Sequence, residues 1–417
     1  MPARRLLFLQ AFVVIYILYA LTLYPGVAGG DSGELLAEAC LLGTPHPPGY
    51  PLYTVACALA RNLLAGLPRL YLDCSEPVWR LHLDYTPTHA WRVNNLCAVM
   101  GSTAAALVAL TCYDILCLLG GQVQHGGIAA ASLTGAILFA LSPLVWEYSI
   151  TAEVFALNNL LCAAVCYLTI RVYISSKVLR STTLTSRNLY LGALFSGFCM
   201  ANQHSSLLLL VVLVPAALVF AYPLSLHPTT LSVAAMSFFA GMSPYAYLVV
   251  SSRSPKPGSW GDTRGVQGLI RHVLRAEYGT FQLGIKAGSE TFVQRVVLYL
   301  KHASQETFHL VFPLAILGIF YAWQAGQQPV AAAITTTGGS TLSRKQHRNL
   351  QRGAREAAVA VAASQDEVYS ATTGKGGGAT VLVLTSAWLF YLLAWHGVLS
   401  NLPLDSPMPY GVHARFW

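Results

Sequence analysis

The chain has 417 residues, of which 55% are hydrophobic and only 10% are charged, and its mean hydropathy is +0.53. Soluble domains carry about 25% charged residues, so this composition excludes an ordinary soluble protein and predicts one embedded in a membrane. The net charge of +8 does not indicate nucleic-acid binding, because the basic residues are scattered among apolar stretches and their loops.

Apolar stretches that could cross a membrane recur along the whole chain. A helix needs about 20 apolar residues to do so. Nine ranges meet or approach this length, namely 6–23, 94–118, 129–145, 153–171, 189–203, 205–222, 230–250, 307–323 and 379–399. The fifth and sixth are short and almost contiguous, so a broken hairpin is an alternative for them. The predicted fold class is an all-α integral membrane protein, a polytopic helical bundle of about nine spans.

The first apolar stretch, 6–23, has two interpretations. Arg4 and Arg5 precede its apolar run, as in a cleavable signal peptide. However, no small-x-small cleavage site directly ends the run, and cleavage at Val27–Gly29 would free the following acidic turn from its anchor. We therefore expect a retained signal-anchor.

Basic residues in the loops predict the orientation. The loops 172–188 and 324–378 carry clusters of Arg and Lys, which places them and the N-terminus in the cytosol. The opposite side, expected to be the lumen of the endoplasmic reticulum, receives 13 of the 17 acidic residues and, after an odd number of spans, the C-terminus. The chain then divides into a membrane module (1–323), a cytosolic insertion (324–378), and a last span with the start of a luminal tail (379–417). The insertion is rich in Ala, Gly, Ser and Thr and is predicted to be disordered.

The first luminal loop, 24–93, is long and patterned. Residues 35–42 and 53–67 have helical apolar spacing and predict amphipathic helices lying in the membrane interface. The run PHPPGYP between them predicts a rigid turn, because proline fixes φ. Cys40, Cys57 and Cys74 share this loop and allow one disulfide without fixing its pairing.

Asp31 and Glu34 lie in the turn GGDSGE at the mouth of the first span. Carboxylates this close to hydrocarbon cost roughly 2.5–3.5 kcal/mol each if they face lipid, so a water-filled cavity is expected. His46 in the rigid turn is a candidate wall of that cavity, and a solvated His in a helix-connecting turn is the alternative.

Two other segments are expected to reach the same side. Glu153 opens a predicted helix behind Thr151, although a favourable interaction with the helix dipole would by itself explain an acid there. Asn202, Gln203 and His204 lie at the tip between the fifth and sixth spans. Polar groups from several segments on one membrane face make a common cavity more plausible than unrelated surface roles.

Arg271 and Arg275 are four residues apart, so both are expected on one face of a helix. Paired guanidinium groups at a membrane surface suit a phosphate. Contact with lipid headgroups, or pairing with Glu277 or Asp262, is the alternative. No CxxC, metal-ligand spacing, DxD motif, Walker motif or nucleophile elbow occurs, so no metal site is predicted.

Taken together, GGDSGE, PHPPGYPLY, TAEVFALNN, ANQH, the WGD…RAEYGTF segment and NLPLDSPMPYGVHARFW resemble the eukaryotic transmembrane O-mannosyltransferases that glycosylate plexins and Met-type receptors. That family is similar to the GT-C glycosyltransferases. The resemblance implies an enzyme of the endoplasmic reticulum membrane that transfers mannose from dolichyl-phosphate mannose to Ser or Thr hydroxyls of secretory proteins. It further implies inversion at the sugar, and no metal or cofactor besides the donor.

The resemblance also implies roles for individual residues. Asp31 matches the catalytic base and Glu34 a second catalytic carboxylate. Donor- or acceptor-binding positions are implied at His46, Glu153, His204, Trp260, Asp262, Arg275 and Tyr278. The insertion at 324–378 departs from the fold core, and the closing motif stops at Trp417, which leads us to expect a short or truncated form. A transporter or flippase of a lipid-linked sugar is the alternative function, but the paired, interrupted halves typical of transporters are not evident.

Overall fold

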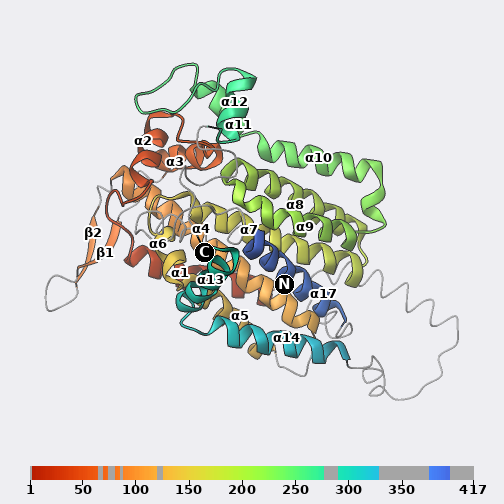
Figure 1. Cartoon of the computed structure of the whole chain (residues 1–417). Helices are drawn as coiled ribbons and strands as arrows, with labels where there is room; N and C mark the ends of the chain where they lie inside the picture. The colour runs from red at the N-terminus through yellow and green to blue at the C-terminus, as the bar shows by residue number, and fades with distance from the viewer. Residues whose placement is uncertain are drawn as a thin grey trace, which may run out of the picture.

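The computed structural model describes residues 2–63, 69–73, 80–84, 88–119, 125–276, 290–327 and 375–394. The helices of this part, drawn in Figure 1, are α1 (Pro2–Leu21), α2 (Ser32–Leu41), α3 (Pro51–Leu63), α4 (His89–Leu119), α5 (His125–Ala140), α6 (Pro143–Ser149), α7 (Val154–Tyr173), α8 (Thr182–Asn202), α9 (Leu207–Phe220), α10 (Pro228–Met242), α11 (Tyr245–Ser251), α12 (Val266–Val273), α13 (Phe292–Glu306), α14 (Val311–Gln327) and α17 (Lys375–Tyr391). A π-helical turn follows α7 at Ile174–Val178, and short 3₁₀ turns lie at His204–Ser206 and Leu224–Leu226.

The helical character predicted from the composition is confirmed, including both helices expected in the loop after the first span, α2 and α3. One addition was not foreseen. Strands β1 (Arg69–Asp73) and β2 (Arg80–Asp84) form an antiparallel pair in which Tyr71 lies opposite His82. The predicted insertion falls mostly on residues 328–374, outside the described residues.

The predicted number of membrane crossings is not confirmed. Each of the nine predicted ranges overlaps a helix, but only four helices in the described part of the chain are long and apolar enough to span a bilayer. They are Ala3–Leu21, His89–Leu119, Val154–Val178 and Pro228–Ser251. Two bent pairs, α5 with α6 and α13 with α14, raise the number to six if each pair is one span. The apolar helices His204–Phe220 and Gly378–Ala394 are shorter than a bilayer requires, and α8 has 21 residues but is not among the candidate spans.

The two bends meet at one carboxylate. Helix α6 turns away from α5 by 73°, and α14 turns away from α13 by 94°. Pro143 begins α6 because proline suits the first helical position and cannot continue the preceding helix. Glu306, the last residue of α13, accepts hydrogen bonds from Ser142 Oγ at 3.0 Å and from the Leu144 amide at 2.9 Å. It therefore caps the start of α6 from a distant part of the chain.

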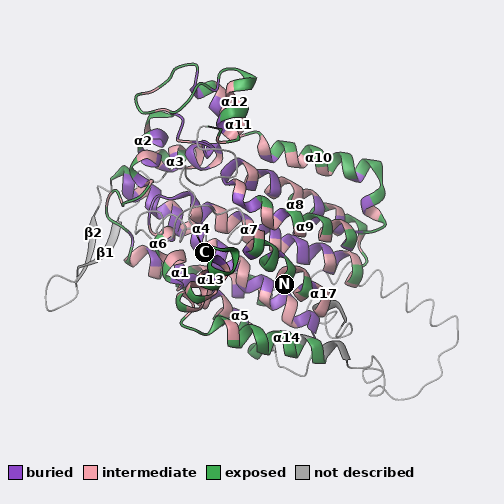
Figure 2. Cartoon of the chain, viewed as in Figure 1, coloured by how far each residue is buried: buried purple, intermediate pink, exposed green. Residues whose placement is uncertain are grey.

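The centre of the bundle is α4, which packs against α1, α5 and α7. On α1, the residues Leu7, Ala11, Ile15 and Tyr19 recur every fourth position and are all buried, so they form one stripe. The facing side of α4 carries small buried residues, which let the helix backbones approach closely. Figure 2 shows the same division, with buried residues along the inner faces of the central helices and exposed apolar residues on α10 and α14.

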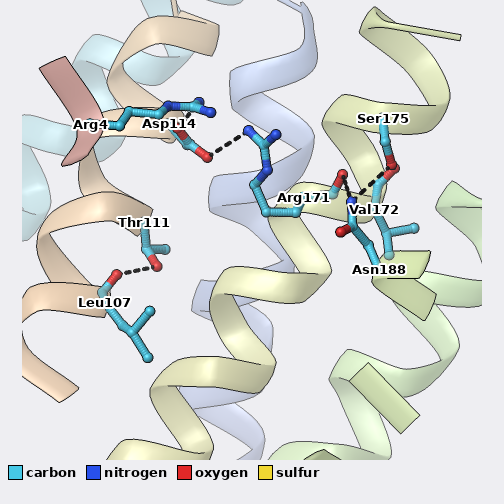
Figure 3. A network of polar contacts seen from close by, with 8 residues as sticks. All are labelled: Arg4, Leu107, Thr111, Asp114, Arg171, Val172, Ser175 and Asn188. Atoms are coloured by element: carbon cyan, nitrogen blue, oxygen red, sulfur yellow. Dashed lines mark hydrogen bonds and ion pairs between the residues drawn. The ribbon is translucent and has the colours of Figure 1, made fainter. Parts of the chain in front are cut away.

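A buried ionic network joins three helices at one end of the bundle. Asp114 on α4 is fully buried and pairs with Arg4 on α1, and its other carboxylate oxygen accepts from Arg171 on α7 at 3.3 Å (Figure 3). Asn188 on α8 extends the network by donating to the carbonyl oxygen of Arg171 at 3.2 Å and to Ser175 Oγ at 3.3 Å. Because the helices run alternately up and down, residues 31, 153 and 202–204 lie at the other end of the same helices. We call this other end the carboxylate end.

Candidate active site

The segment after α1 is held in place by hydrogen bonds to two other elements. Asn94, fully buried on α4, donates to the carbonyl oxygens of Tyr24 at 2.8 Å and Gly26 at 2.9 Å. The amide of Tyr24 donates to the carbonyl oxygen of Ile150 at 3.2 Å. These contacts fix the path of the chain into α2 and bring its first residues next to the start of α7.

Asp31 and Glu153 meet at that junction. The backbone amide of Asp31 donates to Glu153 Oε1 at 3.0 Å. Glu153 is 2% exposed and precedes α7, yet its side chain makes no capping hydrogen bond to that helix. The helix dipole alone is therefore not a sufficient account of this acid, because it also holds the start of α2. Asp31 does not cap α2 with its side chain either, and it is partly exposed.

Glu34 is bound by the predicted rigid turn. Its Oε1 accepts from the amide of His46 at 2.7 Å, and its Oε2 lies 3.0 Å from His46 Nδ1. The other ring nitrogen, Nε2, lies 3.2 Å from the Tyr50 hydroxyl. Burial favours a higher pKa for Glu34, but the hydrogen bonds and charge of His46, together with a hydrogen bond from Trp260, outweigh it and lower this pKa. The turn thus keeps Glu34 ionised and fixes the imidazole orientation.

Tyr50 lies within electrostatic range of several charged groups. The charges of Arg275, Asp31, Glu153 and Glu34 all act on its hydroxyl. Burial raises the pKa of Tyr50, so the hydroxyl remains protonated. This residue was not predicted as a site residue. Its position in the PHPPGYPLY motif was the available signal, but the motif was interpreted only as a turn.

Trp260 and Asp262 are placed differently from one another. The Trp260 ring lies edge-on to His46, with centroids 6.4 Å apart, and its amide donates to the Thr44 carbonyl oxygen at 2.8 Å. Asp262 turns to Arg264, whose Nε donates to Oδ1 at 2.9 Å, and its side chain is 59% exposed. The structure therefore brings Trp260 to the His46 turn, whereas Asp262 pairs at the surface, and its binding role stays a prediction.

The expectation that Arg271 and Arg275 share one helix face is wrong. Helix α12 ends at Val273, and Arg275 has a φ of 54°, which turns the chain away from the helical path. As a result Arg271 is exposed, while Arg275 is partly buried and lies close enough to His204 and Tyr50 to influence both electrostatically. Only Arg275 belongs to the carboxylate end.

His272 is a residue that the sequence analysis missed. It is 3% exposed, and its ring lies between two glycines, both with positive φ. A Cβ at Gly49 would lie 3.0 Å from its Nε2, and one at Gly261 would lie 2.9 Å from its Nδ1. Because the amide of Arg275 donates to the His272 carbonyl oxygen at 3.0 Å, this packing fixes where Arg275 leaves the helix.

His204 is oriented by Tyr245. Its Nε2 lies 2.7 Å from the Tyr245 hydroxyl, which itself donates to the Met200 carbonyl oxygen at 2.6 Å. Since that hydroxyl proton is used, Nε2 carries the proton of the imidazole and donates to Tyr245. Nearby, Asn202 donates to the carbonyl oxygen of Val154 at 3.2 Å, which joins the tip after α8 to the start of α7. Tyr278 lies outside the described residues.

Glu38 is a second carboxylate of α2 with a different environment. It is 1% exposed, and its Oε2 accepts from Ser259 Oγ at 2.8 Å. Burial raises its pKa, and the charge of Glu34 adds to the effect, while the hydrogen bonds from Ser259 and Thr44 oppose it. The Ser259 hydroxyl also accepts from the Thr44 amide at 3.0 Å, so Glu38 ties α2 to the segment that carries Trp260.

Replacing Glu38 with Gln is expected to raise the apparent melting temperature in detergent at neutral pH by a few degrees. The pKa of Glu38 is raised on folding, so the protonated form is favoured and stability is lost as the pH rises above the ordinary value of 4.5. The difference from wild type should therefore grow with pH. Glu34 is the matched control: its pKa is lowered, its stabilisation is present above 4.5 and lost at lower pH, and Glu34→Gln should destabilise at neutral pH. Equal changes of melting temperature in both variants would contradict the opposite pKa shifts assigned to Glu38 and Glu34.

Two further expectations concern cysteines and metals. Cys40 and Cys57 are both free thiols, so the disulfide does not join these two, and Cys74 lies outside the described residues. In the described parts of the chain, no group of three or more His, Cys, Asp or Glu side chains is arranged to hold a metal ion. The absence of a metal from the reaction stays a prediction.

Comparisons with known proteins find one family model and two relatives that resemble the chain. The model described as "Protein O-mannosyl-transferase TMEM260 N-terminal domain" matches residues 31–71 and 69–225, which contain most of the carboxylate end. The chain is similar to Protein O-mannosyl-transferase TMEM260 of Mus musculus, with 35% identity over 276 residues, covering 65% of this chain and 34% of that protein. It is also similar to Protein O-mannosyl-transferase tmem260 of Dictyostelium discoideum, with 26% identity over 418 residues, covering 97% of this chain and 42% of that protein.

No solved structure matches the chain. The chain spans between 34% and 42% of the length of these two relatives. The matched residues include DSGE, PHPPGYPLY and TAEVFALNN, from which Asp31, Glu34, His46 and Glu153 meet at the carboxylate end. These matches support the resemblance of the chain to the protein O-mannosyl-transferases named TMEM260.

Proposed function

We propose that the chain transfers mannose from dolichyl-phosphate mannose to a Ser or Thr hydroxyl of a secretory protein. The observation that carries the proposal is the meeting of Asp31 with Glu153 and of Glu34 with His46 at one end of a membrane bundle, within electrostatic range of Arg275 through Tyr50. Carboxylates can accept a proton, and an arginine can neutralise a phosphate leaving group. A lipid-linked donor suits this placement, since its chain stays in the bilayer while its sugar phosphate reaches the bundle end.

Asp31 is the proposed base. It is partly exposed, whereas Glu153 is buried and binds the Asp31 amide and Glu34 is bound by His46. In the reaction the acceptor oxygen bonds to C1 of mannose, the bond from C1 to the phosphate oxygen breaks, and Asp31 takes the hydroxyl proton. One displacement inverts the configuration at C1, and a phosphate leaving group needs no metal if a guanidinium stabilises it. By the charge of the loops, this end faces the lumen of the endoplasmic reticulum and the N-terminus is cytosolic.

The test is a transfer assay on the purified chain in detergent, with radiolabelled dolichyl-phosphate mannose and Ser/Thr peptides. Micelles hold no gradient and no second compartment, so a flippase would produce no labelled peptide in this assay. We expect labelled peptide and dolichyl phosphate to form in equal amounts. NMR of the product should show that the anomeric configuration of mannose is inverted. If the label stays on the lipid in micelles but crosses the bilayer of reconstituted vesicles, the chain is a flippase and the proposal is wrong.

Replacing Arg275 with Lys is expected to raise the donor KM or lower kcat by about tenfold or more. Lysine keeps the charge but loses the planar fork that grips a phosphate through two N–H groups. Arg271→Lys is the matched control, because Arg271 lies four residues away but is exposed. It should leave both constants unchanged. A change in the acceptor KM alone would assign Arg275 to the peptide instead of the donor.

A further inference from the structure

A groove lined mainly by apolar side chains runs between α2, α3 and α11, with a volume of about 480 Å³. Its apolar lining includes Ala39 of α2, Leu59 of α3 and Val250 of α11. Leu59 is 56% exposed and Val250 is 62% exposed, so the groove opens to the surroundings. Its volume is within the range of pockets that hold small organic ligands.

The groove is distinct from the carboxylate cluster. Ala39 follows Asp31 by eight residues, which corresponds to about 12 Å along the axis of α2. Between them, Glu38 points to Ser259, and neither Asp31 nor Glu34 lines the groove. The two sites therefore lie at opposite ends of one short helix.

Two basic residues border this apolar groove. Arg61 and Lys256 line it together with the polar side chains of Asn62 and Ser254, and no carboxylate is among its lining residues in the described part of the chain. The Arg61 guanidinium is fixed by a hydrogen bond from its NH1 to the Cys40 carbonyl oxygen at 2.7 Å. Cationic and hydrogen-bond-donating side chains beside an apolar groove are complementary to a lipid with an anionic head group and an apolar chain.

We propose that this groove binds a polyprenyl monophosphate, the carrier left after mannose transfer. The inference rests on the proposed function. When the bond from C1 to the phosphate oxygen breaks, its electron pair stays on the phosphate, and the diester with one negative charge becomes a monoester with nearly two. At the carboxylate end Arg275 shares the site with the acids Asp31, Glu34 and Glu153. The groove instead offers Arg61 and Lys256 with no carboxylate among its lining residues, which favours the more highly charged product. Movement along α2 then clears the carboxylate end for the next donor.

The test is equilibrium binding of radiolabelled geranylgeranyl monophosphate to the full chain in neutral detergent. Lys256→Gln should weaken binding about tenfold, since hydrogen bonds to charged groups are among the stronger ones. Ala58→Trp, which fills the groove without a change of charge, should weaken it similarly. Arg253→Gln is the matched control, because Arg253 is exposed on the same segment and does not line the groove. It should bind the probe within twofold of wild type.

Three results would overturn the inference. The first is binding to Lys256→Gln that equals the control. The second is equal displacement of the probe by phosphatidylglycerol, which would indicate a general phospholipid site. The third is loss of binding in Arg275→Lys but not in Lys256→Gln, which would place the probe at the carboxylate end. Mannose transfer is measured in a separate assay, so the binding result and the transfer result can be distinguished. A chain that shows the predicted binding pattern but no transfer would contradict the proposed function and still support the groove as a lipid phosphate site.

Discussion

Asp31→Asn is expected to reduce mannose transfer by about 10²- to 10⁴-fold, the range contributed by a general base. The amide keeps the shape of the side chain and cannot accept the acceptor's hydroxyl proton. The contact that positions this residue uses its backbone amide and Glu153, so the substitution leaves it intact. Expression and apparent melting temperature should therefore match wild type. The measurement is kcat/KM in the micellar transfer assay, normalised to folded protein.

The control is Glu147→Gln. Glu147 lies on α6, a few residues before Glu153, and is exposed. Its loss should leave transfer unchanged, which separates a general effect of negative charge from the loss of a base. If Asp31→Asn retained activity within twofold of wild type, the base would be another carboxylate, and Glu34→Gln and Glu153→Gln would be compared next.

Asp114→Asn is expected to lower the free energy of unfolding by about 3–5 kcal/mol, because it removes the charge that pairs with two largely buried arginines while keeping the side-chain volume. Arg4 and Arg171 have side chains that are 11% and 9% exposed, so neither can recover full hydration without a helix shift. The effect should appear as a lower apparent melting temperature and as loss of protein during extraction.

The same chain offers an internal control for that experiment. Asp262 also pairs with an arginine, but both side chains are about 60% exposed, at 59% and 62%. Exposed ion pairs contribute little to stability because water screens their charges. Asp262→Asn should therefore leave the melting temperature unchanged. Similar losses in the two variants would show that burial of the Asp114 network is not what stabilises the bundle.

Local sequence was sufficient for part of the site. The apolar spacing of α2 and α3 predicted both helices, and GGDSGE with PHPPGYP predicted that Asp31, Glu34 and His46 would lie together. These contacts connect residues close in sequence. The helical spacing of the apolar residues and the prolines of the turn were therefore sufficient to predict them. Glu153 was also expected at this end, although its bond to the Asp31 amide required the packing of α4 against α7.

The remainder depends on contacts that sequence spacing does not reveal. Asp114 lies inside a predicted span, and its partner Arg4 is 110 residues away, so the ionic network had no local signature. The end of α12 at Val273 is marked by neither glycine nor proline, so the helix was expected to continue through Arg275. His272 likewise owes its place to Gly49 and Gly261, which are distant in the chain.

The cap that Glu306 provides to α6 imposes an order on assembly during synthesis. Ser142 and Glu306 are 164 residues apart, so the ribosome completes α6 through α12 before the carboxylate exists. Until then, the Leu144 amide has to find water or another acceptor at the bend. The segment from α6 to Glu153 can therefore reach its final arrangement only after α13 has been made. A nascent chain that ends before α13 would hold the carboxylate end in an immature form, and maturation of this end would be a late, post-insertion step.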